Sequence, residues 1–141
     1  DEAIKAYDSA LALDPDNVFA YNALGDAWYG LGDRDKAIAA YAKGVEIDPH
    51  DATAHFNLGE LYYDLGEFAN AEQECLEAIR LDPAFTLPYL TLGSLYMDQE
   101  HISDAIKSLE TYLKMEKSPQ AAETVSEVRA VVEGLKAELK K

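Results

Sequence analysis

The sequence is poor in basic residues and has no long apolar run, and each absence excludes a class of partner. It holds 12 Lys and Arg against 27 Asp and Glu, a net charge of −15. Binding to nucleic-acid phosphates needs a basic surface, so no nucleic-acid partner is expected. No stretch approaches the roughly 18 apolar residues of a membrane span, so no membrane contact is expected. The acidic start lacks the positive charge of a signal peptide, which leaves the compartment open with a slight preference for the cytoplasm.

Cysteine and histidine are also scarce. The single Cys75 excludes an internal disulfide and any metal site built from several cysteines, and its helical spacing within an apolar stripe predicts a buried side chain. The three histidines lack the spacing of a zinc site: His50, His55 and His101. The sequence therefore predicts no metal, no cofactor and no catalytic group, and we expect the protein not to be an enzyme.

What the sequence does contain is an internal repeat of 34 residues. Three independent markers follow this period: the Leu-Gly pairs that begin at 24, 58 and 92, the prolines at 15, 49 and 83, and the alanines at 3, 37, 71 and 105. Self-similarity at a fixed period is typical of an array of identical supersecondary units.

Each repeat reads as two helices joined by a short turn. Apolar and small residues recur at helical spacing in the first half of a unit (Tyr21, Leu24, Gly25 and Trp28), and a second such stripe follows the turn at Gly32. A proline after the second stripe ends that helix, and neighbouring Asp and Asn side chains can cap the next one. The chain is therefore predicted to be all-α and built from helical hairpins.

Glycine recurs at two positions of the repeat, and each position predicts a different role. Gly25 and Gly59 lie on the core stripe of the first helix, where we expect them to face Ala37 and Ala71 and to let the two backbones approach. The glycines at 32 and 66 fall where the chain reverses, which favours left-handed backbone angles.

These residues resemble the tetratricopeptide repeat family, which implies a right-handed superhelix of helical hairpins. The resemblance is nearly complete over "VFAYNALGDAWYGLGDRDKAIAAYAKGVEIDPHD" (18–51) and "ATAHFNLGELYYDLGEFANAEQECLEAIRLDPAF" (52–85). Segment 86–119 departs from the pattern at its turn and end, with Glu100 for the turn glycine, Tyr112 for a small residue and Pro119 two residues late. Segment 1–17 matches only the second helix of a repeat.

The two ends of the array carry separate expectations. The lone first helix should leave Ile4, Tyr7 and Leu11 bare, so we expect the chain to continue upstream or this face to be buried by a second copy. Segment 120–141 resembles the capping helix that ends such arrays, with Ser118 as its cap and Pro119 at its first position. Its apolar stripe is Ala122, Val125, Val128, Val132, Leu135 and Leu139.

A candidate binding strip lies on the first helix of each repeat, on the side predicted to face away from the core. The resemblance implies that first helices line the concave groove of the array. The side chains expected there are large and apolar, acidic or amide: Phe19, Asn22, Asp26, Tyr29, Phe56, Asn57, Glu60, Tyr63, Leu87, Leu90 and Met97. Exposed aromatic residues are typical binding hot spots, which favours a binding role, and the alternative is that these side chains pack on one another and on neighbouring repeats.

The chemistry of this strip predicts the kind of ligand. The family's carboxylate clamp for chaperone C-termini uses Lys and Arg where this sequence has Asn22, Leu87 and Thr91, and only Asn57 fits, so the clamp is absent. A free carboxylate would instead meet Asp26 and Glu60. We therefore expect a protein or peptide partner with basic and apolar side chains.

The predicted function is a non-catalytic protein-interaction scaffold. Two alternatives stay open: a self-associating structural module that pairs through the open N-terminal helix face, and the targeting arm of a larger enzyme.

Overall fold

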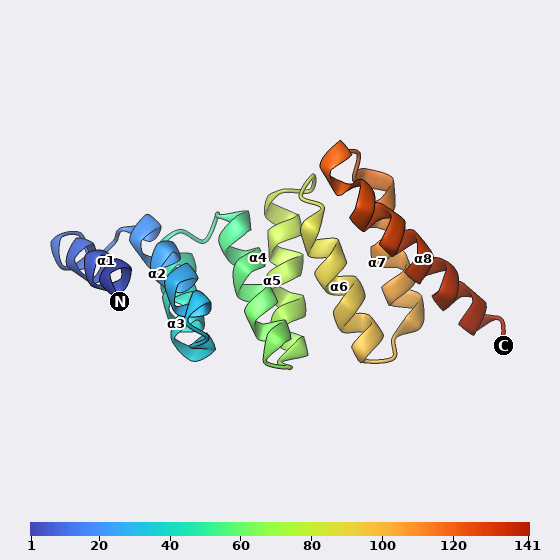
Figure 1. Ribbon diagram of the computed structural model, residues 1–141, viewed down its shortest axis with the longest axis horizontal. Helices are drawn as coiled ribbons and strands as arrows, with labels where there is room; N and C mark the ends of the chain where they lie inside the picture. The colour runs from blue at the N-terminus through green and yellow to red at the C-terminus, as the bar shows by residue number, and fades with distance from the viewer. The chain divides into compact units, whose positions relative to one another are not determined.

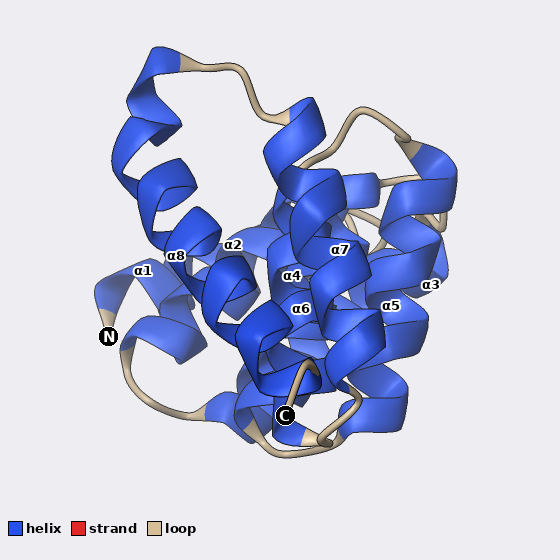
Figure 2. Cartoon of the chain, turned by 90° about the vertical axis from the view of Figure 1, so that its right-hand side faces the viewer, coloured by secondary structure: helices blue, strands red, loops and turns tan.

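The computed structural model describes residues 1–141, and all of its regular secondary structure is helical (Figures 1 and 2). The helices are α1 (Glu2–Leu13), α2 (Val18–Gly30), α3 (Arg34–Ile47), α4 (Ala52–Asp64), α5 (Phe68–Leu81), α6 (Leu87–Asp98), α7 (Ile102–Met115) and α8 (Ala122–Leu139), with a 3-10 turn, η1 (Pro119–Ala121), before the last. The predicted all-α fold is confirmed. No helix combines the length and the apolar character that crossing a membrane requires.

Polar side chains cap the starts of three helices in the first two repeats, as the sequence predicted for Asp and Asn. The side chains of Asn17, Asp33 and Asp51 each accept the backbone N–H three residues further on, at 3.0 to 3.2 Å. Such a bond satisfies one of the N–H groups that a helix start leaves without a partner, and it contributes about 1 kcal/mol. These caps determine where α2, α3 and α4 begin.

The turns inside the three hairpins share one backbone conformation. Gly32 and Gly66 have φ angles of 84° and 76°, and Glu100 adopts 60° at the equivalent place. The residue after each of them donates its N–H to the carbonyl oxygen five residues back, at 2.8 to 3.0 Å. This is the Schellman arrangement that ends helices with a left-handed residue. The predicted turn role of the two glycines is confirmed, and the third hairpin keeps the same turn without a glycine.

Close helix packing inside the hairpins requires glycine, and the nearest contacts differ between hairpins. A Cβ on Gly25 would lie 2.7 Å from a carbon of the Tyr41 ring, so Tyr41 is its nearest neighbour and was not among the expected contacts. Ala37 is fully buried one helical turn away. Gly59 does face Ala71, whose carbonyl oxygen would lie 3.3 Å from such a Cβ. The missing side chain therefore makes room for a tyrosine ring in one hairpin and for backbone in the next.

Cys75 is a fully buried, free cysteine on α5. Its Sγ lies where a Cβ on Gly59 would approach to 2.9 Å. Burial raises the pKa of this thiol to about 12, so it stays protonated and acts as a small apolar side chain. The prediction of a buried cysteine is confirmed.

The chain divides into two compact units, residues 1–81 and 82–141, each described by itself. In the first unit α1 packs on α2, α2 on α3, α3 on α4 and α4 on α5. The expectation that α1 leaves its apolar residues bare is wrong for the three side chains named. Ile4 is buried against Leu24, and Tyr7 and Leu11 pack half-buried on the same cluster. The face of α2 supplies enough apolar surface to cover them.

In the second unit, α6 packs on α7 and α7 on α8. Its core consists of buried side chains from the last two helices: Ala105, Ile106, Leu109, Tyr112, Val128, Val132 and Leu135. The predicted α8 stripe is thus buried at its centre, whereas Leu139 at its end is 55% exposed.

The start of α8 differs from the sequence-based expectation. Pro119 opens the 3-10 turn rather than the α-helix, which begins at Ala122, and the Ser118 side chain forms no capping hydrogen bond. The Glu116 carboxylate takes over the local hydrogen bonding instead. It accepts the Ser118 N–H at 2.9 Å and the Thr86 hydroxyl at 2.8 Å, and these bonds lower the pKa of Glu116.

Candidate functional site

The outer side of α2 presents three of the predicted binding residues. Phe19 is 77% exposed and Tyr29 48% exposed, and Asp26 is also exposed. Asn22 differs: its Oδ1 is buried, without a hydrogen-bond partner, and lies against Gly44 of α3. The expectation that Asn22 faces away from the core is therefore wrong.

On α4 the predicted strip is interrupted by a buried aromatic residue. Phe56 is only 6% exposed, so the expectation that it points away from the core is wrong. Glu60 is exposed, and Asn57 and Tyr63 are half-buried. The reason is that α4 packs on both α3 and α5, which buries a wider arc of its surface than contact with one partner helix would. The equivalent of Phe56 on α2 is Asn22, which is turned inward for the same reason.

Four of the predicted residues line one pocket in the first unit. Asp26 and Tyr29 from α2 meet Asn57 and Glu60 from α4 around a space of about 200 Å³. The remaining lining residues are Tyr41 of α3 and Leu61 of α4. The pocket therefore combines two carboxylates, one amide and two tyrosine rings.

Tyr41 is the pocket residue that the sequence did not reveal. Its hydroxyl donates a hydrogen bond to Oδ1 of Asp26, and its ring occupies the space left by Gly25. Burial, the bond to Asp26 and nearby negative charge raise the pKa of Tyr41, so the hydroxyl keeps its proton. The sequence signal was present, because a buried tyrosine needs a partner for its hydroxyl and Asp26 was the acid next to the packing glycine.

A third acidic group, Asp64, lies next to the pocket residue Tyr29 and is paired with a cation of the same chain. The Tyr29 hydroxyl donates to Oδ2 of Asp64 at 3.4 Å, and Arg34 Nε is 3.8 Å from the same oxygen. The Arg34 guanidinium also lies 5.7 Å from the centre of the Tyr29 ring. Tyr29 and Asp64 together thus hold a guanidinium group.

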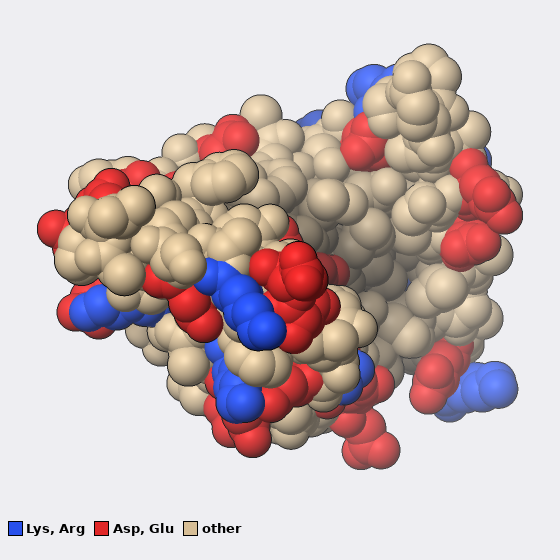
Figure 3. All heavy atoms as spheres, turned by 60° about the vertical axis from the view of Figure 1, so that its left-hand side comes forward, with Lys and Arg blue, Asp and Glu red and all other residues tan.

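The pocket's own carboxylates have no such neutralising partner. Neither Asp26 nor Glu60 forms an ion pair, and partial burial together with the Asp64 charge raises the pKa of Glu60. Acidic side chains are spread over the face shown in Figure 3, where the few Lys and Arg side chains lie next to acidic ones. The electrostatic field at the pocket therefore favours a cation.

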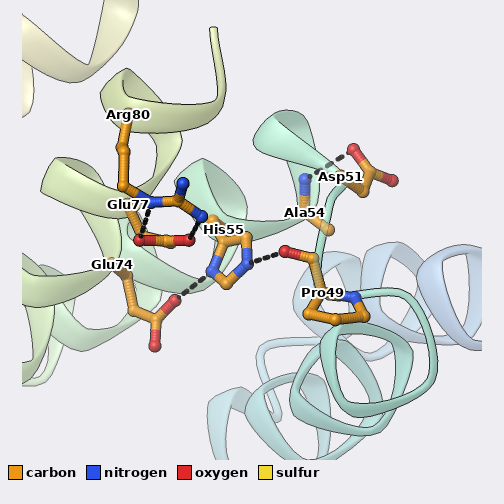
Figure 4. A network of polar contacts seen from close by, with 7 residues as sticks. All are labelled: Pro49, Asp51, Ala54, His55, Glu74, Glu77 and Arg80. Carbon is orange, nitrogen blue, oxygen red and sulfur yellow. Dashed lines mark hydrogen bonds and ion pairs between the residues drawn. The ribbon is translucent and has the colours of Figure 1, made fainter.

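His55 has a structural position between consecutive repeats. Its Nδ1 is 2.6 Å from a carboxylate oxygen of Glu74 on α5, and its Nε2 is 2.9 Å from the Pro49 carbonyl oxygen in the loop before α4 (Figure 4). Both contacts are within hydrogen-bonding distance, so the ring links α4 to α5 and to the loop that precedes α4. The side chain is buried, and no group of three or more His, Cys, Asp or Glu in the structure is placed to hold a metal ion.

The predicted residues of the second unit are divided between packing and surface. Leu90 and Met97 pack half-buried against the α7–α8 core, whereas Leu87 is 44% exposed. Leu87 and Leu90 line an open groove of about 570 Å³ whose other walls come from the loop before α6, the end of α7, the turn η1 and the start of α8. The alternative that these side chains serve packing therefore holds for Leu90 and Met97, and Leu87 is the one predicted residue of α6 that is exposed.

Family comparisons agree with the hairpin architecture. Models described as "TPR repeat" match residues 1–32 and 25–66, and models described as "Tetratricopeptide repeat" match 52–85 and 88–119. The chain belongs to the tetratricopeptide repeat family. No curated protein matches this TPR protein as a relative.

Several solved TPR structures share its fold. The crystal structure of MamA aligns with a TM-score of 0.82 at 25% identity, over 96% of this chain and 79% of that one. The first TPR of Spaghetti (RPAP3), bound to the HSP90 peptide SRMEEVD, aligns with a TM-score of 0.70 at 25% identity, over 82% and 92%. The TPR2B domain of yeast Sti1, in complex with an Hsp70 peptide, shows the fold at 18% identity, with a TM-score of 0.78 over 86% and 97%.

Proposed function

We propose that this TPR protein is a protein-interaction module and that its α2–α4 face binds a partner segment with basic and apolar side chains. The observation that carries the proposal is the pocket of Asp26, Tyr29, Tyr41, Asn57 and Glu60, whose two carboxylates have no internal cation. The exposed aromatic side chains of α2 add the kind of apolar surface that is typical of binding hot spots.

The structural neighbours support peptide binding in general, and one neighbour's peptide allows the charge of the ligand to be compared. The RPAP3 repeat binds a peptide with three acidic side chains, SRMEEVD. Such a segment placed on the α2–α4 face would meet Asp26, Glu60 and Asp64 and be repelled. Electrostatic complementarity therefore favours a segment of opposite charge.

Apolar contacts would come from the exposed aromatic side chains of α2. Phe19 is 77% exposed and Tyr29 is 48% exposed, and neither belongs to the core clusters around α1 to α4. Both rings are therefore free of a core packing role. Aromatic rings offer large contact area at a small entropy cost, which suits short peptide segments.

The proposal can be tested by selecting short random peptides on the purified protein and measuring the affinity of the enriched sequences by fluorescence polarisation. We expect enrichment of Arg or Lys beside apolar residues. Glu60→Lys should weaken binding about tenfold or more, because it replaces attraction by repulsion. Glu127→Lys, the same charge change at an exposed site on α8, should leave the affinity unchanged.

Salt and assembly state separate this function from its alternatives. Binding to a basic segment should weaken as potassium chloride rises from about 0.01 M to about 1 M, since the Debye length falls from about 30 Å to about 3 Å. Enrichment of acidic peptides, or equal binding by the Glu60→Lys variant, would contradict the proposal. Concentration-dependent dimers in light scattering without peptide binding would favour the self-association function instead.

A further inference from the structure

The strongest unexplained feature is the way the α2–α3–α4 pocket mixes unpaired carboxylates with aromatic walls. Asp26 and Glu60 project from neighbouring helices, and the Tyr29 and Tyr41 rings close two sides. The Lys and Arg side chains that form ion pairs form them with other acids, for example Lys36 with Asp33 and Lys43 with Glu46. The negative charge of the pocket is therefore left for an external group.

We propose that this pocket takes the guanidinium group of a single arginine side chain of the partner. The inference rests on the proposed function, because it names the anchor by which the α2–α4 face would recognise a basic segment. It assigns the ion-pair contacts to Asp26 and Glu60, the stacking surface to Tyr29 and a further amide contact to Asn57.

The choice of arginine over lysine follows from the lining of the pocket. A guanidinium is planar and weakly hydrated, so it can stack on an aromatic ring while its edge donates to carboxylates. An ammonium group is a compact, strongly hydrated charge that gains less from aromatic walls. Carboxylates on two different helices suit the several diverging N–H donors of one guanidinium.

The protein itself already shows this chemistry at the edge of the same pocket. The Arg34 guanidinium lies 5.7 Å from the centre of the Tyr29 ring, and its Nε is 3.8 Å from Asp64. One tyrosine and one carboxylate thus hold an arginine in partly exposed surroundings. The pocket offers a second tyrosine and two further carboxylates within a more enclosed space.

Asp26 keeps acceptor capacity although Tyr41 is bonded to it. The Tyr41 hydroxyl uses Oδ1, and a carboxylate has two oxygens with about four acceptor positions. The Tyr41 bond also orients the Asp26 side chain, so part of the ordering cost of binding is met before the ligand arrives.

Nuclear magnetic resonance titration with N-acetyl-arginine methylamide tests the inference without knowledge of the partner. We expect amide shifts centred on Asp26, Tyr29, Asn57 and Glu60, with a Kd on the order of 1 mM for so small a ligand. N-acetyl-lysine methylamide should bind several-fold more weakly. The citrulline analogue, which has arginine's shape without its charge, should produce no saturable shift.

Conservative variants keep the test independent of folding. Glu60→Gln removes one charge from an exposed side chain and should weaken the arginine probe several-fold, whereas Glu127→Gln on α8 should not. Asp26→Asn retains an oxygen that can accept the Tyr41 hydroxyl and should weaken the probe similarly.

The outcomes separate this inference from the broader function. Equal shifts with the arginine and citrulline probes, shifts at other sites, or a Glu60→Gln variant that binds like wild type would overturn the arginine pocket. Basic peptides could still bind the α2–α4 face in that case, which would leave the proposed function standing. Saturable arginine binding at the pocket with no peptide binding would support the pocket and contradict the wider function.

Discussion

At the scale of single residues, the pocket depends on one position of the repeat that holds a different residue in each hairpin. Tyr41, Cys75 and Leu109 occupy the same place in successive hairpins, each against the packing glycine of its first helix. Only the tyrosine carries a hydroxyl, and Asp26 accepts the hydrogen bond that this hydroxyl donates. The tyrosine–aspartate hydrogen bond is thus found in one repeat, although the packing position of the tyrosine is shared by all three hairpins.

The Tyr41 hydroxyl predicts a fall in stability at high pH. Its pKa is raised in the folded protein above the ordinary value of 10.0, so above about pH 10 the unfolded chain loses a proton that the folded chain retains. Stability from this group is complete below pH 10 and is lost as pH rises, by up to about 1.4 kcal/mol per pH unit.

Urea unfolding at pH 9 and pH 11 would measure this effect. Wild type should lose more free energy of unfolding between the two than Tyr41→Phe does. Tyr7→Phe, a half-buried tyrosine of α1 outside the pocket, serves as the control and should behave like wild type. A Tyr41→Phe variant with the same loss as wild type would show that the Tyr41–Asp26 bond does not control this proton.

At the scale of the structural element, the helical hairpin is determined by local signals along the chain. Capping side chains start the helices, left-handed residues end the first helix of each hairpin, and a glycine lets the two helices approach. The caps and turns act within a few residues of sequence and the glycine contacts lie within one hairpin, so the 34-residue pattern predicted the hairpins correctly. The predicted start of α8 was wrong because a distant residue takes part in the turn before it. The Ser118 N–H and the Thr86 hydroxyl both donate to the Glu116 carboxylate, and Thr86 lies 32 residues before Ser118 in the sequence.

The third hairpin predicts a stabilising substitution. Glu100 holds a left-handed φ of 60° that is strained for a residue with a Cβ, so Glu100→Gly should raise the free energy of unfolding by about 1 kcal/mol. Gly66→Ala should lower the free energy of unfolding by about 1 to 2 kcal/mol, because a residue with a Cβ is strained at a φ of 76°. No atom lies within 4 Å of the new Cβ, so the loss would report backbone strain and not a steric clash.

Urea denaturation of both variants would test this pair. Glu100→Ala separates backbone strain from loss of charge, since it keeps a Cβ in the same conformation and should give little gain. If Glu100→Ala stabilises as much as Glu100→Gly, the strain explanation is wrong and charge is the cause.

At the scale of the whole molecule, excess negative charge is the dominant electrostatic property. The net charge of −15 is spread over 141 residues, and only a few acids are paired with Lys or Arg. Such self-repulsion keeps a protein soluble but disfavours the compact state. The same property would draw a basic partner towards the surface and speed its association.

Salt should therefore stabilise this protein. We expect the Tm to rise by a few degrees as potassium chloride increases from about 0.01 M to about 1 M, because the Debye length falls over that range and repulsion is screened. Differential scanning fluorimetry would measure the shift, and sodium chloride should produce the same rise if screening is the cause. A Tm that falls with salt would show that attractive ion pairs outweigh the net repulsion.

The sequence by itself determined the helices of the hairpins, the caps of α2, α3 and α4 and the glycine turns, because these depend on contacts between residues close in the chain or on spacing within one helix. Only the tertiary structure decided which outward residues stay exposed. Phe56 and Asn22 occupied the predicted strip, yet packing of their helices against neighbours turned both inward. The pocket likewise needed the approach of three helices, which brought the Tyr41 hydroxyl to Asp26 and placed Glu60 beside it. Burial by two partner helices at once is a property of the packed array, and the periodicity of a single helix does not record it.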